Sequence, residues 1–361
     1  MTSHPGSVGE AGGGARSTRP RPAAPSPAGV TVPFLHEVRS TFADLVAIVS
    51  KARGIPEPFV EKDYWVTHTL WALQQQPHLT LCFKGGTSLA KCFGLIERFS
   101  EDVDLQLAVD DAAGLPPVPH PWHNEHADAR RAHFAALGRL LAVPGARVEY
   151  LADEHAPRHC NAVYAVRYEP AFRDPGDTIR PYVQIEVTPD AVSAAVGEPV
   201  ASMLHDAPQF RAQGGRWRDN RPSSIVCMHP LATLLGKLEA ISRQYADPAR
   251  EPQDFARHYE DAHHIVRRAG EDGGLPALPG GQTARDLAAD MYRTRQLRRA
   301  LDAADVAFAA PPGGGGGGRW ADVEQAHAAL AGWYWGKRTP LDECCDLIRA
   351  WLGAEGPFRA P

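Results

Sequence analysis

Two aspartates one residue apart are the side chains of this sequence best suited to chemistry. Asp102 and Asp104 lie in the segment SEDVDL, where they alternate with Val103 and Leu105. A period of two predicts a strand that turns both carboxylates to one face and the apolar residues to the core. Neighbouring carboxylates raise each other's pKa unless a cation lies between them. The pair therefore predicts a site for a hard divalent ion, Mg²⁺ or Mn²⁺ in its place, and the alternative is a solvated strand face.

A glycine pair precedes these aspartates. Residues 79–83 form a short apolar run that predicts a buried strand, and a helical spacing begins near Leu89. Glycines at such a junction let a ligand approach the backbone, and the first N–H groups of a helix attract anions. Most glycine pairs are ordinary turns, but beside the aspartates we expect this segment to bind phosphate. The segment consists of Lys84, Gly85, Gly86, Thr87 and Ser88.

These motifs resemble those of a known group of enzymes. Gly-Gly-Thr-Ser after one strand and Asp-x-Asp on the next is similar to the nucleotidyltransferase superfamily that includes DNA polymerase β. More narrowly, FKGGTSLAK, RFSEDVDL and the upstream EKDYWVTHTLWAL resemble the AbiEii/AbiGii toxin family and its MenT-type relatives. The resemblance extends over about residues 59–299.

The resemblance implies an α+β fold, with a nucleotidyltransferase mixed-sheet lobe at the N-terminus followed by a helical lobe. It implies a toxin that transfers NMP from an NTP to an RNA acceptor, the tRNA 3′ end first among them, by a Mg²⁺-dependent in-line attack. A cognate antitoxin is the expected partner. The implied metal ligands are Asp102, Asp104 and Glu186, the implied nucleotide-binding residues are Lys84, Gly85, Gly86, Thr87, Ser88, Ser100 and Lys237, and Lys237 and Asp261 complete the catalytic set.

Two of these residues also have ordinary explanations, and a third departs from the family's motif. Glu186 follows Ile185 on the polar side of a predicted strand, and Glu149 on an earlier strand competes for the role of third carboxylate. Lys237 lies at the edge of an apolar helical stripe, where it must extend to solvent or meet an anion. Asp261 matches the family's R-x-x-Y-D type of motif, but here Glu260 separates it from the tyrosine.

Other charged groups are weaker candidates. Consecutive Glu61, Lys62 and Asp63 cannot share one face of a helix predicted over residues 57–75, so at least one should point inward. His120, His123 and His126 have a spacing that suits zinc only in a helix, which the prolines among them prevent. We interpret these histidines as part of a loop.

The periodicity divides the chain into five parts. Helices are expected over residues 34–52 and 57–75, strands over 147–151, 162–168 and 182–187, and helices from residue 230 onward, including an arginine-rich one over 283–310. The predicted parts are a disordered extension (1–32), a nucleotidyltransferase lobe (33–225), a helical lobe (226–310), a glycine-rich linker (311–319) and C-terminal helices (320–361).

Composition limits the remaining possibilities. The 361-residue chain has a formal net charge of −5, yet residues 211–300 carry more Lys and Arg than Asp and Glu, which suits contact with RNA phosphates. Neither a transmembrane run nor a signal peptide is evident, so a cytoplasmic location without membrane contact is expected. The six cysteines lack zinc spacing and are expected to be reduced. An NTP-binding module without transferase activity and nucleotidylation of a protein remain alternatives.

Overall fold

The computed structural model describes residues 32–116, 124–152, 161–176, 178–188, 194–309 and 318–360. Several sequence-based expectations lie outside these ranges. They are nearly all of the predicted disordered extension, most of the glycine-rich linker, His120, His123 and Cys160. The other five cysteines are free thiols.

A mixed sheet forms the centre of the folded unit. Its strand order is β3-β4-β5-β2-β1-β7-β6. The strands are β1 (Leu79–Lys84), β2 (Asp102–Val109), β3 (Arg147–Tyr150), β4 (Ala162–Arg167), β5 (Val183–Thr188), β6 (Ala195–Glu198) and β7 (Ile225–Met228). β2 lies antiparallel to β1 and parallel to β5, so the predicted Asp-x-Asp strand is central.

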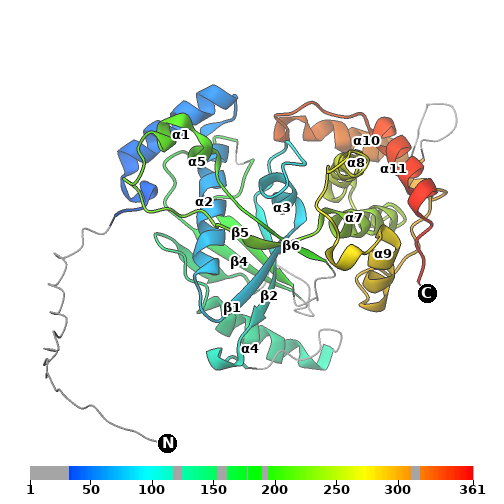
Figure 1. Cartoon of the computed structure of the whole chain (residues 1–361), viewed down its shortest axis with the longest axis horizontal. Coiled ribbons are helices and arrows are strands. Elements are labelled where there is room, and N and C mark those ends of the chain that lie inside the picture. The colour runs from blue at the N-terminus through cyan, green and yellow to red at the C-terminus, as the bar shows by residue number, and fades with distance from the viewer. Residues whose placement is uncertain are drawn as a thin grey trace, which may run out of the picture. The chain divides into compact units, whose positions relative to one another are not determined.

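Helices cover this sheet, and a further group of helices lies to one side of it (Figure 1). They are α1 (Arg39–Arg53), α2 (Glu57–Gln74), α3 (Gly85–Lys91), α4 (Ala127–Gly138), α5 (Met203–Asp206), α6 (Pro208–Arg211), α7 (Pro230–Tyr245), α8 (Arg257–Ala269), α9 (Ala284–Arg293), α10 (Arg319–Ala329) and α11 (Leu341–Glu355). Short 3₁₀ turns are η1 (Leu35–Glu37), η2 (Asp111–Ala113), η3 (Asn124–His126), η4 (Pro252–Asp254), η5 (Pro279–Gly281), η6 (Val306–Phe308) and η7 (Leu330–Trp333). The α+β class expected from the sequence is confirmed.

Two hydrophobic cores hold these elements together. The first lies between the sheet and helices α1, α2 and α4, and it contains Val103 and Leu105 from the inner face of β2. The second joins helices α7, α8 and α9 to α10 and α11, so the chain on both sides of residues 310–317 packs into one core. The proposed domain boundaries stay a prediction.

The expected helix over residues 283–310 is wrong in its length. α9 ends at Arg293, and Arg295 takes a left-handed conformation with φ 61°. The N–H groups of Gln296 and Leu297 both bond back to the carbonyl of Met291, which closes the helix end. The chain then turns so that Leu297 and Leu301 enter the second core. Arg295, Arg298 and Arg299 therefore do not lie on a helix.

The sequence analysis also did not predict β6 and β7. Both have four residues, and β7 joins the sheet through a parallel pairing with β1 at Phe83 and Cys227. In the part of the chain that the structure describes, no helix is both long and apolar enough to cross a membrane.

Candidate active site

Three carboxylates lie on neighbouring central strands. The alternating burial of β2 places Val103 and Leu105 in the core and leaves Asp102 and Asp104 on the opposite, partly exposed face. Pairing in register sets Asp104 directly beside Glu186 of β5 and opposite Lys84 of β1. Directly opposed residues in a sheet point to the same face. The side chains of Asp104, Glu186 and Lys84 therefore lie side by side on this face.

The environment of these strands disfavours charge on the aspartates. Burial raises the pKa of Asp104 to about 6, and the neighbouring charge of Glu186 adds to this effect. Lys84 opposes the shift but does not cancel it. The pKa of Asp102 is also raised, first by burial, although the guanidinium of Arg180 works against it. A cation placed between the two aspartates would relieve this cost.

The glycine pair is required by close approach of side chains. Gly85 has φ +77°, and a Cβ on it would lie 2.0 Å from Oδ2 of Asp104. A Cβ on Gly86 would lie 2.7 Å from Nη2 of Arg98 and 3.0 Å from Oγ of Ser100. No other residue type fits at Gly85 without moving the Asp104 carboxylate. The glycines therefore let an acid and an arginine reach the start of α3.

The hydroxyl groups of this segment brace the turn. Thr87 donates to the backbone carbonyl of Asp102 or to Oγ of Ser100, and the hydroxyl of Ser88 donates to the carbonyl of Gly85 at 2.9 Å. Both Thr87 and Ser88 are buried. The helix begins at Gly85 itself, whereas the sequence predicted a glycine turn before it. We conclude that Thr87 and Ser88 join α3 to β2.

A network of ion pairs holds the start of β2, the strand that carries the two aspartates. Nζ of Lys62, which is fully buried, lies 2.6 Å from Oε2 of Glu101. Arg180 Nη1 lies 2.9 Å from both Glu101 Oε1 and Asp102 Oδ1, so it bridges the two carboxylates. Asp63, which like Lys62 belongs to α2, forms an ion pair with Lys91 at the end of α3. The charged triplet of α2 therefore points inward, as expected for at least one of its members.

A second buried network joins the sheet to the helical part of the molecule. The guanidinium of Arg98 donates twice to Asp261, with distances of 2.8 Å and 2.7 Å. Nζ of Lys237 lies 2.8 Å from Oδ2 of the same aspartate and 3.2 Å from Nδ1 of His258. Burial alone would raise the pKa of Asp261, but Arg98 and Lys237 outweigh it and hold this pKa well below its usual range. Asp261 thus stays charged and fixes both cations.

A cavity of about 640 Å³ opens between these two networks. Its polar wall contains Gly85, Gly86, Arg98, Ser100, Glu101, Asp102, Asp104, Arg180, Lys237, Gln253, Arg257 and His258. The other wall contains Phe99, Ala326, Ala329, Leu330, Trp333 and Tyr334. We call the first set of lining residues the polar wall and the second set, made mostly of apolar groups, the apolar wall.

The cavity brings together most of the residues proposed from the sequence. Gly85, Gly86, Ser100, Asp102, Asp104 and Lys237 line it. Glu186 lies beside Asp104 and accepts a hydrogen bond from Asn161 at 2.9 Å. Asp261 lies behind Lys237, and Lys84 lies opposite Asp104. Thr87 and Ser88 are not among the residues that line the cavity.

Glu149 does not share this position. It lies on β3, which β4 and β5 separate from β2 in the sheet. Its carboxylate lies 2.6 Å from Nε of Arg167. Of the two candidates for a third carboxylate, Glu186 is therefore the one next to the aspartates.

The sequence analysis missed Arg98 and Arg180 as site residues. Arg98 follows Leu95 and Ile96, and an arginine in an apolar segment must find a carboxylate because a lone buried charge is expensive. That signal could have identified Arg98 but not its partner. Arg180 lies in a loop and carried no pattern.

The carboxylates of Asp102 and Asp104 are suited to a cation that also binds the phosphates of a substrate. Among the described residues, no hydrogen bond or ion pair reaches the carboxylate of Asp104, and Asp102 is held only through Arg180. In the same ranges, no group of three or more His, Cys, Asp and Glu side chains is arranged to hold a metal ion. Two carboxylates completed by substrate phosphates are the usual ligands of Mg²⁺, so the two aspartates fit this ion.

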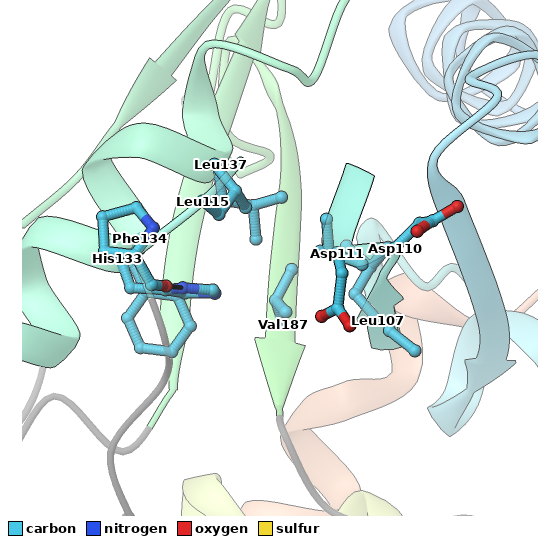
Figure 2. Close-up of a pocket in the computed structure, with 11 residues that line it drawn as sticks. Leu107, Asp110, Asp111, Leu115, His133, Phe134, Leu137 and Val187 are labelled. Atoms are coloured by element: carbon cyan, nitrogen blue, oxygen red, sulfur yellow. Dashed lines mark hydrogen bonds between the residues drawn. The ribbon is translucent and has the colours of Figure 1, made fainter. Parts of the chain in front are cut away.

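A second cavity lies at the far end of β2. Figure 2 shows its lining residues between this strand end and α4. The cavity has a volume of about 410 Å³. Its polar groups are engaged locally, since Asp110 accepts a hydrogen bond from the N–H of Ala112 at 2.9 Å and His133 bonds to the carbonyl of Pro116. We do not assign chemistry to this cavity.

An acid pair on a central strand, a glycine-started helix beside it and basic groups that line the same cavity are the features expected of a nucleotidyltransferase. Residues 69–310 match the family described as "Nucleotidyl transferase AbiEii toxin, Type IV TA system". The chain therefore belongs to the AbiEii family of nucleotidyltransferase toxins of type IV toxin–antitoxin systems.

The chain is also similar to a solved structure. MenT4, a nucleotidyltransferase toxin from Mycobacterium tuberculosis H37Rv, matches with a TM-score of 0.43 and 17% sequence identity, over 84% of this chain and 99% of that one. No curated protein matches the chain in sequence.

Proposed function

We propose that this protein transfers NMP from an NTP to an RNA acceptor, the tRNA 3′ end first among them. The observation that carries the proposal is the register of the central strands, which sets Asp104 beside Glu186 and opposite Lys84. Acids next to a lysine at a cavity edge suit a reaction in which a hydroxyl loses a proton while phosphate charge develops.

The proposed reaction is an in-line displacement. The acceptor hydroxyl attacks the α-phosphorus, its proton passes to a carboxylate, and pyrophosphate leaves from the opposite side. Glu186, adjacent to Asp104, is the proposed proton acceptor.

Mg²⁺, or Mn²⁺ in its place, would be held by Asp102 and Asp104 with Glu186 nearby. When bound, such an ion neutralises phosphate charge and polarises the attacked phosphoryl group. Arg180 would have to release Asp102 for this, because its Nη1 lies 2.9 Å from Oδ1 of that aspartate. Arg180 is free to turn to a phosphate, since its side chain is 41% exposed.

The leaving pyrophosphate needs positive charge on the polar wall. Lys237 and Arg98 supply it there, and both line the cavity. Asp261 holds the two cations in place, and its charge opposes the lowering of the pKa of Lys237 by burial. Gly85, Gly86 and Ser100 also line the cavity, and we propose that they contact the β- and γ-phosphates. Asp261 is thus proposed as a positioning residue.

Family membership supports a cognate antitoxin as the partner. RNA as the acceptor is proposed from the charge of the chain. The excess of Lys and Arg over Asp and Glu in residues 211–300 supports a polyanionic acceptor. Exposed arginines in this region include Arg293 and Arg295, beside the end of α9.

The test is a transfer reaction with purified protein, Mg²⁺, each labelled NTP in turn and total tRNA, followed on a gel that separates RNA from protein. Asp104→Asn should abolish labelling. Asp110→Asn is the matched control, because this residue lies just beyond the other end of β2 and asparagine keeps its capping role.

The outcomes separate the alternatives. Labelled RNA with wild type and Asp110→Asn, but not with Asp104→Asn, supports the proposal. Label on protein alone would assign a protein acceptor. NTP binding without label on either, from a preparation shown to be folded, would reduce the chain to a nucleotide-binding module.

A further inference from the structure

The apolar wall of the cavity comes from the C-terminal part of the chain. Ala326 and Ala329 belong to α10, Leu330 and Trp333 to η7, and Tyr334 follows directly. All of them lie beyond residues 69–310, the range that matches the AbiEii family. The polar wall is therefore made by the family region, and the apolar wall, apart from Phe99, is made by an additional segment.

This segment is attached firmly to the site. The N–H of Phe99 donates to the carbonyl of Trp333 at 2.7 Å, and the N–H of Trp335 donates to the carbonyl of Glu97 at 3.1 Å. Residues 97–99 and 333–335 thus pair like two strands, and Arg98 forms a bridge with Tyr334. The backbone that presents Arg98 to the phosphate side also positions the apolar wall.

A second attachment comes from α8. Glu260, fully buried, accepts from Nε of Arg338 at 2.8 Å and from the N–H of Thr339 at 2.9 Å. The guanidinium of Arg338 lies over the ring of Tyr334, 4.1 Å from its centroid. The residue that interrupts the family's tyrosine–aspartate motif therefore holds this segment in place.

Two aromatic side chains of the wall are suited to a ligand. Trp333 is partly exposed and packs against Phe99, with ring centroids 6.1 Å apart. The hydroxyl of Tyr334 is buried, and among the described residues it has no hydrogen-bond partner. A buried hydroxyl without a partner is costly, so a ligand that bonds to it would be favoured.

We propose that Leu330, Trp333 and Tyr334 form the subsite for the nucleoside of the NTP, with Trp333 against the base and the Tyr334 hydroxyl bonded to the nucleotide. This inference rests on the proposed nucleotidyl transfer and adds the part of the substrate that the family region leaves unassigned. Aromatic faces bind any base by stacking, and selectivity then depends on polar neighbours such as Gln253.

The cavity's layout favours the nucleotide over the RNA acceptor. The polar wall must bind the triphosphate, since the two aspartates, Arg98 and Lys237 lie there. The nucleoside is joined covalently to that triphosphate and must occupy space next to it in the same cavity. The apolar wall is the remaining surface of this cavity of about 640 Å³.

The experiment compares ligands with and without a base. Calorimetric titration of the full chain with Mg²⁺ would measure binding of ATP, CTP, GTP and UTP, and of inorganic triphosphate as the probe that lacks a nucleoside. The variants are Trp333→Leu and Tyr334→Phe. Trp335→Leu is the matched control, because Trp335 is 39% exposed and does not line the cavity.

Trp333→Leu should weaken the best-bound NTP by about five- to a hundredfold, the usual range for one stacked base. Tyr334→Phe should weaken it by about two- to tenfold, as expected for one hydrogen bond. Triphosphate binding should not change in either variant, which also shows that the variants are folded. Trp335→Leu should bind both ligands as wild type does.

Three results would overturn the inference. The first is an equal loss of affinity for NTP and for triphosphate in the variants, and the second is no loss of affinity for either ligand. The third is a wild-type protein that binds triphosphate as tightly as every NTP. A parallel titration with tRNA supplies a fourth: weaker tRNA binding by Trp333→Leu with intact NTP affinity would assign the wall to the acceptor and overturn the inference. Base-dependent NTP binding without any transfer would leave the subsite standing and remove only the proposed transfer.

Discussion

Replacing Asp104 with asparagine should make the protein inactive and more stable at neutral pH. Asparagine has nearly the same shape as aspartate, so the change removes a charge and little else. The pKa of Asp104 is raised from 3.8 to about 6, first by burial and then by Glu186. At 1.36 kcal/mol per pKa unit, the charged carboxylate costs the folded state about 3 kcal/mol, or about half of that after solvent screening of a partly exposed group.

The pH dependence of this gain follows from the direction of the shift. A carboxyl group whose folded pKa is raised binds more protons in the folded than in the unfolded state between pH 3.8 and about 6, so its contribution to stability falls as pH rises through this window. The stabilisation by asparagine should be complete near pH 7.5, about half as large at pH 5, and absent below pH 4.

Chemical denaturation of Asp104→Asn and wild type at pH 7.5 and pH 5, without divalent ions, measures this difference. Asp110→Asn, an exposed aspartate, is the control and should change stability little at either pH. Adding Mg²⁺ with NTP should stabilise wild type more than Asp104→Asn, because a ligand stabilises only the state that binds it. Loss of stability in Asp104→Asn at pH 7.5, or a gain that does not shrink at pH 5, would refute the reasoning.

Three further predictions test other parts of the site and core. Gly85→Ala should abolish transfer and destabilise the fold by more than Gly54→Ala, because both glycines have positive φ but only at Gly85 would a Cβ meet another side chain, 2.0 Å away. Comparing the two unfolding free energies isolates this clash. Arg98→Met should lower the unfolding free energy by about 3–5 kcal/mol, since it leaves buried Asp261 without its paired hydrogen bonds, and urea denaturation would measure it. Burial lowers the pKa of His68 to about 3 from 6.5, so it stays neutral in the folded state while the unfolded chain gains a proton. Stability should therefore fall from pH 6.5 downward, by about 2 kcal/mol at pH 5 for this residue, and less steeply in His68→Gln.

The sequence predicted the elements of the site better than their connections. Alternation placed Asp102 and Asp104 on one face, and the structure confirms that face for both. It predicted the strand that carries Glu186, but not that this strand lies directly beside the aspartates in parallel register. Strand order depends on packing across the whole sheet, which no local pattern records.

The long-range ion pairs could not be predicted. Arg98 and Asp261 are separated by 163 residues, and only the fold brings them to 2.7 Å. Likewise β6 and β7 are too short to show a period, and they exist because the edge of β1 offers unpaired backbone groups. Local propensity also failed beyond Arg293, where burial of Leu297 and Leu301 outweighed helix formation.

Adjacent residues on α8 connect the two walls of the cavity. Asp261 faces the sheet, where it holds Arg98 and Lys237 on the polar wall. Glu260 points to a different side of the same helix turn and holds Arg338 next to the apolar wall. Because both carboxylates are fully buried, neither can lose its partners cheaply. A displacement of α8 would therefore move the phosphate-side cations and the proposed nucleoside subsite together, which makes this helix the element that keeps the two halves of the site in register.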